Sequence, residues 1–243
     1  MTYCVAMSLD EGMLFASDSR TNAGLDHVSS FCKMTVFEQT GQGVLVLLNS
    51  GNLATTQQVV SRLKAHAKHT DKPLTEMDSV FSVAELLGKH LRAVVNRTEE
   101  ESMGQTDVDF SATFLLGGQL RGEEPRLFLV YPQGNFIETT ADTAFFQIGE
   151  SKYGKPILDR VVQPALPLYE AVKCALVSFD STIKSNLSVG LPIDLALVRR
   201  DQFAVAMRHR IDADDAYFRQ LRTDWSQGLR RVFNELPEPG WLR

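Results

Sequence analysis

The chain has 243 residues, of which 44% are hydrophobic and 23% charged, and its formal net charge is −5. These fractions are near globular averages and exclude a disordered chain, and the mild negative charge gives no support to nucleic acid as a partner. No apolar run approaches the roughly 18–20 residues of a membrane span, and the N-terminus lacks the regions of a secretory signal. No segment has the composition of a linker. We therefore expect a single domain over residues 1–243 with no nucleic-acid or membrane partner.

Three cysteines are scattered along the chain, at Cys4, Cys32 and Cys174. Their odd number does not fit a disulfide framework and is typical of a reducing compartment, where cysteine behaves as a small apolar residue. We therefore expect a cytoplasmic protein. The sequence shows no ligand constellation for a metal and no glycine-rich phosphate motif, so we expect no cofactor.

Periodicity and turn signals predict two blocks of strands, each interrupted or followed by helices. Expected strands cover residues 2–9, 13–17, 33–38, 43–49, 110–117, 126–131, 134–139, 145–149, 193–199 and 202–208. Expected helices cover residues 51–69, 77–98, 166–184 and 214–234. Residues 18–30 and 99–109 are expected to form surface loops. Because short turns join successive strands, the sheets should be antiparallel, and the fold class should be α+β, a four-layer αββα sandwich.

Thr2 is the first candidate catalytic residue. A threonine hydroxyl is a weak nucleophile that needs an adjacent base. Once Met1 is removed, the α-amine of Thr2 lies on the same residue and, with an ordinary pKa of roughly 7.7–8.0, accepts a proton near neutral pH. Many chains begin Met-Thr without catalysis, so Thr2 needs partners.

Asp18 and Lys33 provide those partners. Asp18 ends the second strand of the first hairpin, which returns the chain to the neighbourhood of Thr2. Lys33 opens the following strand, close to the expected place of Asp18. An ammonium group beside the threonine oxygen would favour the alkoxide electrostatically. Taken singly, Asp18 also fits a turn cap and Lys33 an exposed strand edge.

The N-terminal block resembles that of proteasome β subunits and the bacterial HslV peptidase. The shared pattern is an N-terminal threonine, a glycine-containing turn (Asp10-Glu11-Gly12) and Phe15-Ala16-Ser17-Asp18-Ser19-Arg20. The longer string through Thr21-Asn22-Ala23-Gly24 looks closest to the Anbu family, the bacterial ancestral β subunits. Looser blocks continue the resemblance over nearly the whole chain: Asn49-Ser50-Gly51-Asn52, Ile148-Gly149-Glu150-Ser151 and Pro192-Ile193-Asp194-Leu195-Ala196.

The resemblance implies a role for several positions. Thr2 matches the nucleophile, Asp18 the carboxylate and Lys33 the lysine, although Lys33 comes one residue earlier than in the proteasome β pattern. Gly51 matches the glycine whose backbone N–H contributes to the oxyanion hole, where a helix N-terminus would add positive potential. Ser151 and Ser188 look like supporting hydroxyl groups.

One position departs from the pattern and bears on catalytic strength. Ser185 stands where proteasome subunits carry an aspartate, which weakens the expected network around the nucleophile. The resemblance also implies the αββα fold of N-terminal nucleophile hydrolases and self-assembly into rings or related homo-oligomers. No motif identifies an ATPase partner.

The sequence thus predicts a threonine-dependent hydrolase of peptide or amide bonds that acts through an acyl-enzyme. Two alternatives stay open at this point. The same fold can cleave a small amide instead of a peptide, or the chain can be a catalytically silent assembly subunit. The presence of Thr2, Asp18 and Lys33 together argues against the silent subunit.

Overall fold

The computed structural model describes residues 2–22, 28–69, 73–102 and 108–242. Met1, whose removal the predicted chemistry requires, lies outside these residues, as do Ala23 and Gly24 of the N-terminal motif.

The strands are β1 Tyr3–Leu9, β2 Gly12–Asp18, β3 Arg20–Asn22, β4 Val28–Ser30, β5 Met34–Gln39, β6 Gly43–Gly51, β7 Ala112–Leu120, β8 Arg126–Val130, β9 Phe136–Glu138, β10 Phe145–Gly149, β11 Ile193–Arg199 and β12 Val205–Ile211. The helices are α1 Leu53–His69, α2 Val80–Ser102, α3 Lys155–Val161, α4 Leu168–Ser185 and α5 Ala216–Glu235, with short 3₁₀ turns η1 Leu74–Glu76 and η2 Gly240–Leu242.

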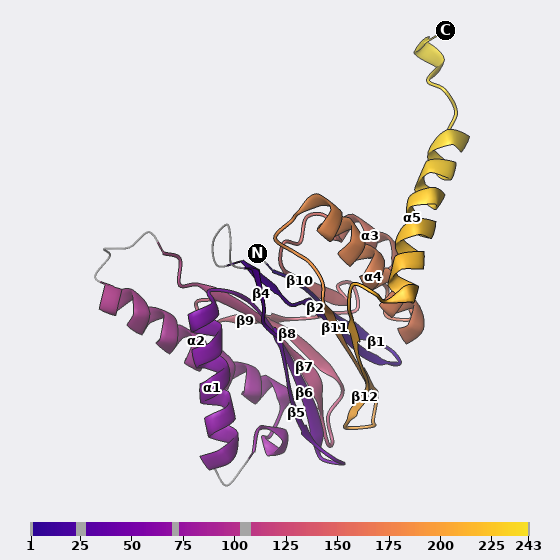
Figure 1. Ribbon diagram of the computed structural model, residues 1–243. Helices are drawn as coiled ribbons and strands as arrows, with labels where there is room; N and C mark the ends of the chain where they lie inside the picture. Colours follow the sequence, from indigo (N-terminus) through magenta and orange to yellow (C-terminus); the bar gives the residue numbers. More distant parts are fainter. Residues whose placement is uncertain (1, 23–27, 70–72, 103–107, 243) are drawn as a thin grey trace.

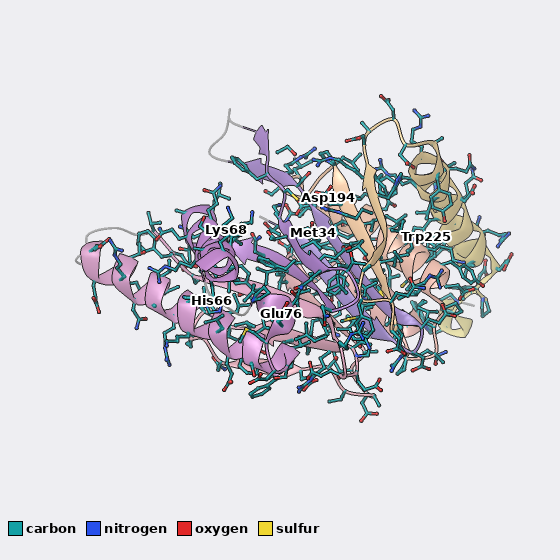
Figure 2. The ribbon with its side chains drawn as sticks, turned by 90° about the horizontal axis from the view of Figure 1, so that it is seen from below. Met34, His66, Lys68, Glu76, Asp194 and Trp225 are labelled. Carbon is teal, nitrogen blue, oxygen red and sulfur yellow. The ribbon has the colours of Figure 1, made fainter. Side chains whose placement is uncertain are left out.

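Two five-stranded antiparallel sheets form the centre of the molecule, in the orders β10-β1-β2-β11-β12 and β5-β6-β7-β8-β9. Helices α1 and α2 cover the outer face of the second sheet, and α3 and α4 cover the outer face of the first, while α5 extends away from the body (Figure 1). Figure 2 shows the same layers from below, with His66 and Lys68 on α1, Met34 and Asp194 in the strands, and Trp225 on α5. The predicted αββα sandwich is confirmed.

The alternation of side chains along each strand explains why the sheets pack on both faces. In β1, Tyr3, Val5 and Met7 pack under α3 and α4, whereas Cys4 and Ala6 point into the core between the two sheets. Both sets are buried. The strand therefore reads as a continuous apolar run instead of the alternating pattern of a sheet with one solvated face.

The structure differs from the sequence prediction at several segments. The expected loop over residues 18–30 contains the short pair β3–β4, and α2 continues four residues beyond Thr98 into the expected loop 99–109. Helix α3 was not predicted. The last strand begins at Val205 and not at Gln202, because Asp201 and Phe203 adopt positive φ and lengthen the turn. None of the helices among the described residues is both long and apolar enough to cross a bilayer.

Candidate active site

The predicted site residues gather where strands of both sheets end at one edge. Tyr3 pairs with Gly149 and Cys4 with Ser17, which brings the start of β1 beside the ends of β2 and β10. In the second sheet Met34 pairs with Leu48, so the start of β5 lies near the end of β6.

Asp18 and Lys33 form a buried ion pair at this edge. Lys33 Nζ donates to Asp18 Oδ1 over 2.7 Å, and the two side chains are 6% and 0% exposed. Lys33 Nζ also donates to the Arg20 carbonyl oxygen at 2.6 Å. The backbone is fixed too, because Asn49 donates to the Lys33 carbonyl oxygen through both its backbone N–H and its side-chain amide. Lys33 therefore lies close to Asp18, as expected from the order of the strands, while its catalytic role stays a prediction.

Asp18 connects this ion pair to the residue next to Thr2. The backbone N–H of Tyr3 donates to Asp18 Oδ1 at 3.0 Å, the same oxygen that accepts from Lys33. Burial raises the pKa of the Asp18 carboxyl, while the Lys33 ammonium and the backbone N–H groups of Tyr3 and Gly190 oppose that rise by stabilising the charged form.

Thr2 is buried and held from the opposite side by the turn after β10. The backbone N–H of Glu150 donates to the Thr2 carbonyl oxygen at 2.7 Å. Gly149 has φ +81°, and a Cβ on it would lie 1.9 Å from that oxygen and 3.1 Å from Ser50 Oγ. Only glycine fits between the two segments. The backbone of Thr2 is therefore fixed from the β10 side, and its neighbour Tyr3 from the β2 side.

Gly51 lies at the end of β6, not in a helix. It pairs with Ala112, has φ +113°, and a Cβ on it would lie 2.5 Å from the Ser111 carbonyl oxygen. Helix α1 begins two residues later, at Leu53. The expectation that Gly51 opens the helix is wrong by these two residues, because close pairing with β7 keeps the glycine in the strand.

Ser151 and Ser188 lie in two turns that meet the same edge. Ser151 directly follows Glu150, and its backbone N–H bonds the Gly149 carbonyl oxygen. The backbone N–H of Ser188 bonds Asn186 Oδ1, and Asn186 Nδ2 donates to Glu150 Oε2 at 2.8 Å. The bond between Asn186 and Glu150 thus links the turns that carry the two serines.

Ser185 is the last residue of α4 and is exposed. The segment after it, residues 186–190, contacts the Asp18 region directly: the Leu187 carbonyl oxygen accepts from Arg20 Nη1 at 2.9 Å. Sequence reasoning gave no role to Arg20, Asn49 or Glu150, although all three lie in the motif blocks that carried the resemblance. The signal that could have found Glu150 is a charged residue directly after an apolar strand and a glycine.

A pocket of about 300 Å³ opens beside Lys33, between the start of β5 and helix α1. Its described lining includes Cys32, Asn49, Gln57 and Lys64. Two lysines and no aspartate or glutamate are among the described lining residues. Because Asp18 neutralises Lys33, the positive charge of this lining comes from Lys64.

Comparison with known proteins agrees with the fold. A model of the family described as "Proteasome subunit" matches residues 2–198. Proteasome subunit beta 2 of Pyrobaculum aerophilum is 26% identical over 198 residues, which cover 81% of this chain and 88% of the relative. Fold and matches together define a proteasome-type N-terminal nucleophile hydrolase, and the chain belongs to the proteasome subunit family.

Solved structures refine this assignment. Anbu, the ancestral beta-subunit, from Yersinia bercovieri is 50% identical with a TM-score of 0.91, and the match covers 98% of both chains. The helical assembly of the Anbu complex from Pseudomonas aeruginosa is 48% identical with a TM-score of 0.92, again over 98% of both chains. The resemblance to Anbu drawn from the N-terminal motif is confirmed.

Proposed function

We propose that this chain is a threonine-dependent hydrolase of peptide or amide bonds, with Thr2 as nucleophile after removal of Met1. The observation that supports this most strongly is the buried Asp18–Lys33 pair, whose shared oxygen also accepts the backbone N–H of Tyr3, the residue next to Thr2. A buried ion pair is weak evidence for stability alone, because desolvation opposes the Coulombic gain. Its place beside an N-terminal threonine gives it a chemical purpose.

The proposed reaction has two halves. Thr2 Oγ attacks the carbonyl carbon while its proton passes to the Thr2 α-amine, directly or through a water molecule. The C–N bond then breaks, and the leaving amine takes that proton. Water hydrolyses the resulting ester by the same route and frees Thr2. Lys33 stabilises the developing alkoxide, and Asp18 holds Lys33 in place.

Gly51, Ser151 and Ser188 have supporting roles in this proposal. The Gly51 N–H donates to the oxyanion of the tetrahedral intermediate, a contribution of the kind that is worth about 3–4 kcal/mol in other hydrolases. Ser151 and Ser188 hold water or the α-amine by hydrogen bonds. The side chain on the acyl side of the cleaved bond enters the pocket beside Lys33, where Lys64 favours an acidic or polar group.

Self-assembly is part of the proposal. The second half of α5 and the segment after it expose large apolar side chains: Leu229, Val232, Phe233, Leu236 and Trp241 are between 52% and 81% exposed. The Pseudomonas aeruginosa relative is described as a helical assembly. We propose a homo-oligomer of the full chain in the cytoplasm, where the three free cysteines would stay reduced.

The test is hydrolysis by protein shown by intact mass to lack Met1. We expect cleavage within a library of fluorogenic peptides and small amides, and no cleavage by Thr2→Ala. Cleavage of small amides alone would favour an amidohydrolase of the same fold. Processed protein that is inert on every substrate would contradict the proposed activity and favour a silent assembly subunit.

A further inference from the structure

Glu150 is a buried carboxylate beside Thr2 that the proposed reaction leaves without a role. Glu150 is 6% exposed, and its backbone N–H donates to the Thr2 carbonyl oxygen. The ladder between β1 and β10 ends at the pair Tyr3–Gly149, and the bond from the Glu150 backbone N–H to the Thr2 carbonyl oxygen extends the contact by one residue on each chain segment. This backbone bond keeps the two residues adjacent at the end of the sheet, so the buried Glu150 carboxylate belongs to the immediate surroundings of Thr2.

The Glu150 carboxylate is held on one side and open on the other. Oε2 accepts from Asn186 Nδ2 at 2.8 Å, whereas Oε1 is buried and finds no hydrogen-bond partner among the described residues. The ammonium group of Lys152 is 3.8 Å from Oε1, but its side chain is 79% exposed. A buried carboxylate oxygen needs a donor, because an unpaired one costs free energy. Glu150 thus has capacity for a further cation.

Three other charged groups near this edge have partners among the described residues. Asp18 and Lys33 neutralise each other, and Arg20 donates to the Leu187 carbonyl oxygen. The α-amine of Thr2 is the charged group that removal of Met1 would add here. A carboxylate that is oriented by Asn186 and lacks a donor is chemically suited to receive it.

We propose that Glu150 is the positioning residue that orients the α-amine of Thr2 and stabilises its ammonium form once Met1 is removed. The inference rests on the proposed function for its purpose, since the amine there acts as proton acceptor. When Thr2 Oγ loses its proton to the amine, the new positive charge is formed beside the Glu150 carboxylate. Asn186, which follows Ser185, fixes that carboxylate, so the network missing an aspartate at position 185 obtains its negative charge from the turn after β10.

The experiment measures the pKa of the Thr2 α-amine, a quantity that does not depend on activity. Protein lacking Met1 is treated with a trace of isotopically labelled acetic anhydride between pH 5 and 10, and acetylation of the N-terminal peptide is followed by mass spectrometry. We expect a pKa above the ordinary range of roughly 7.7–8.0 in the native chain. Glu150→Gln keeps an oxygen acceptor for Asn186 and should lower it by about 1 unit, as expected for loss of one nearby opposite charge.

The control is Glu76→Gln. Glu76 is exposed and accepts a hydrogen bond from Gln39, the last residue of β5, whereas Lys33 directly precedes the first residue of that strand. This change should therefore leave the amine pKa as in the native chain. Equal amine pKa values in the native chain and Glu150→Gln would overturn the inference. If Glu150→Gln does not fold, the native value decides alone: a pKa above 8.0 supports the inference, and a pKa of 8.0 or below overturns it.

Failure of the inference and failure of the proposed function are separable. Labelling of Thr2 Oγ by a β-lactone reports on the function. An elevated amine pKa without any labelling would leave the inference standing and contradict the function. Labelling of Thr2 together with an amine pKa that Glu150→Gln does not change would support the function and overturn the inference.

Discussion

Removal of Lys33 should destabilise the fold strongly, because it would leave the charge of Asp18 buried. The Asp18 side chain is 0% exposed, and it would keep backbone N–H donors from Tyr3 and Gly190 but lose the ammonium group that neutralises it. Breaking a buried ion pair on one side costs about 3–5 kcal/mol. Lys33→Met has nearly the same length and lacks the charge, so we expect this loss for Lys33→Met.

The double variant separates the charge from the packing. In Asp18→Asn/Lys33→Met no charge remains buried, and replacement of a buried ion pair by neutral groups is often close to neutral in stability. We therefore expect the double variant to be more stable than Lys33→Met alone, which requires a coupling free energy of about 1–3 kcal/mol between the two positions.

Urea unfolding followed by circular dichroism is the assay, at one fixed protein concentration because self-assembly also stabilises the folded state. With a denaturant slope of about 3 kcal/mol/M, the loss in Lys33→Met corresponds to a midpoint lower by about 1–2 M urea. A Lys33→Met midpoint within 0.2 M of the native chain (about 0.6 kcal/mol at that slope), or a double variant less stable than Lys33→Met, would contradict the expected cost of an unpaired Asp18 charge.

Four further predictions concern the surroundings of this edge. Gly149→Ala should destabilise by at least about 1–3 kcal/mol, since its φ is +81° and its Cβ would clash with the Thr2 carbonyl oxygen; an unchanged urea midpoint would contradict this. Ellman's reagent at pH 8 should find one accessible thiol that is lost in Cys32→Ser, because Cys32 is the exposed one of the three cysteines. Since burial raises the pKa of the Cys32 thiol, its rate of reaction with Ellman's reagent should also increase with pH. A reaction rate that does not depend on pH would contradict this expectation. Burial also raises the pKa of the Tyr3 phenol, so the unfolded chain loses the phenol proton at a lower pH than the folded chain does. The free energy of unfolding should therefore fall as pH rises above about 10, and Tyr3→Phe should make this fall with pH less steep. An identical slope in the variant would argue against it. Lys64→Glu should change the ratio of cleavage rates for acidic over basic acyl side chains by about fivefold in favour of basic ones, since an exposed ion pair contributes up to about 1 kcal/mol. An unchanged ranking of substrates in a peptide library would exclude Lys64 as a specificity residue.

The sequence predicted the sheets because their signals are local and repeated. Tyr3–Leu9 and Gly12–Asp18 form a hairpin over a short glycine-containing turn, and its geometry alone places Asp18 near Thr2. The position of Lys33 followed from the next strand. The proximity of Asp18 and Lys33 could thus be predicted from element order, whereas their ion pair is seen only in the structure.

The elements that sequence reasoning missed are short or depend on distant contacts. Helix α3, Lys155–Val161, has only seven residues, too few to show helical periodicity. Strands β3 and β4 have three residues each, and among the described residues they form a separate two-stranded sheet. Gly51 stays in β6 because of its pairing with Ala112, sixty-one positions away (112 − 51), which no local pattern reveals.

Glu150 is a site residue that the sequence did not predict, because its environment also depends on contacts between distant segments. Its burial arises because β10 pairs with β1 and because Asn186, from the end of α4, bonds its carboxylate. Both contacts join segments that are far apart in the chain. In the sequence, Glu150 is one charged residue after a strand and a glycine, a pattern that equally fits a solvated turn.

Intact-mass spectrometry before and after treatment with a threonine-directed epoxyketone tests directly whether Thr2 is a free and reactive nucleophile. We expect a mass without Met1, one covalent adduct per chain, and no adduct in Thr2→Ala. A chain that keeps Met1 throughout, or a processed chain that never takes up the probe, would contradict it.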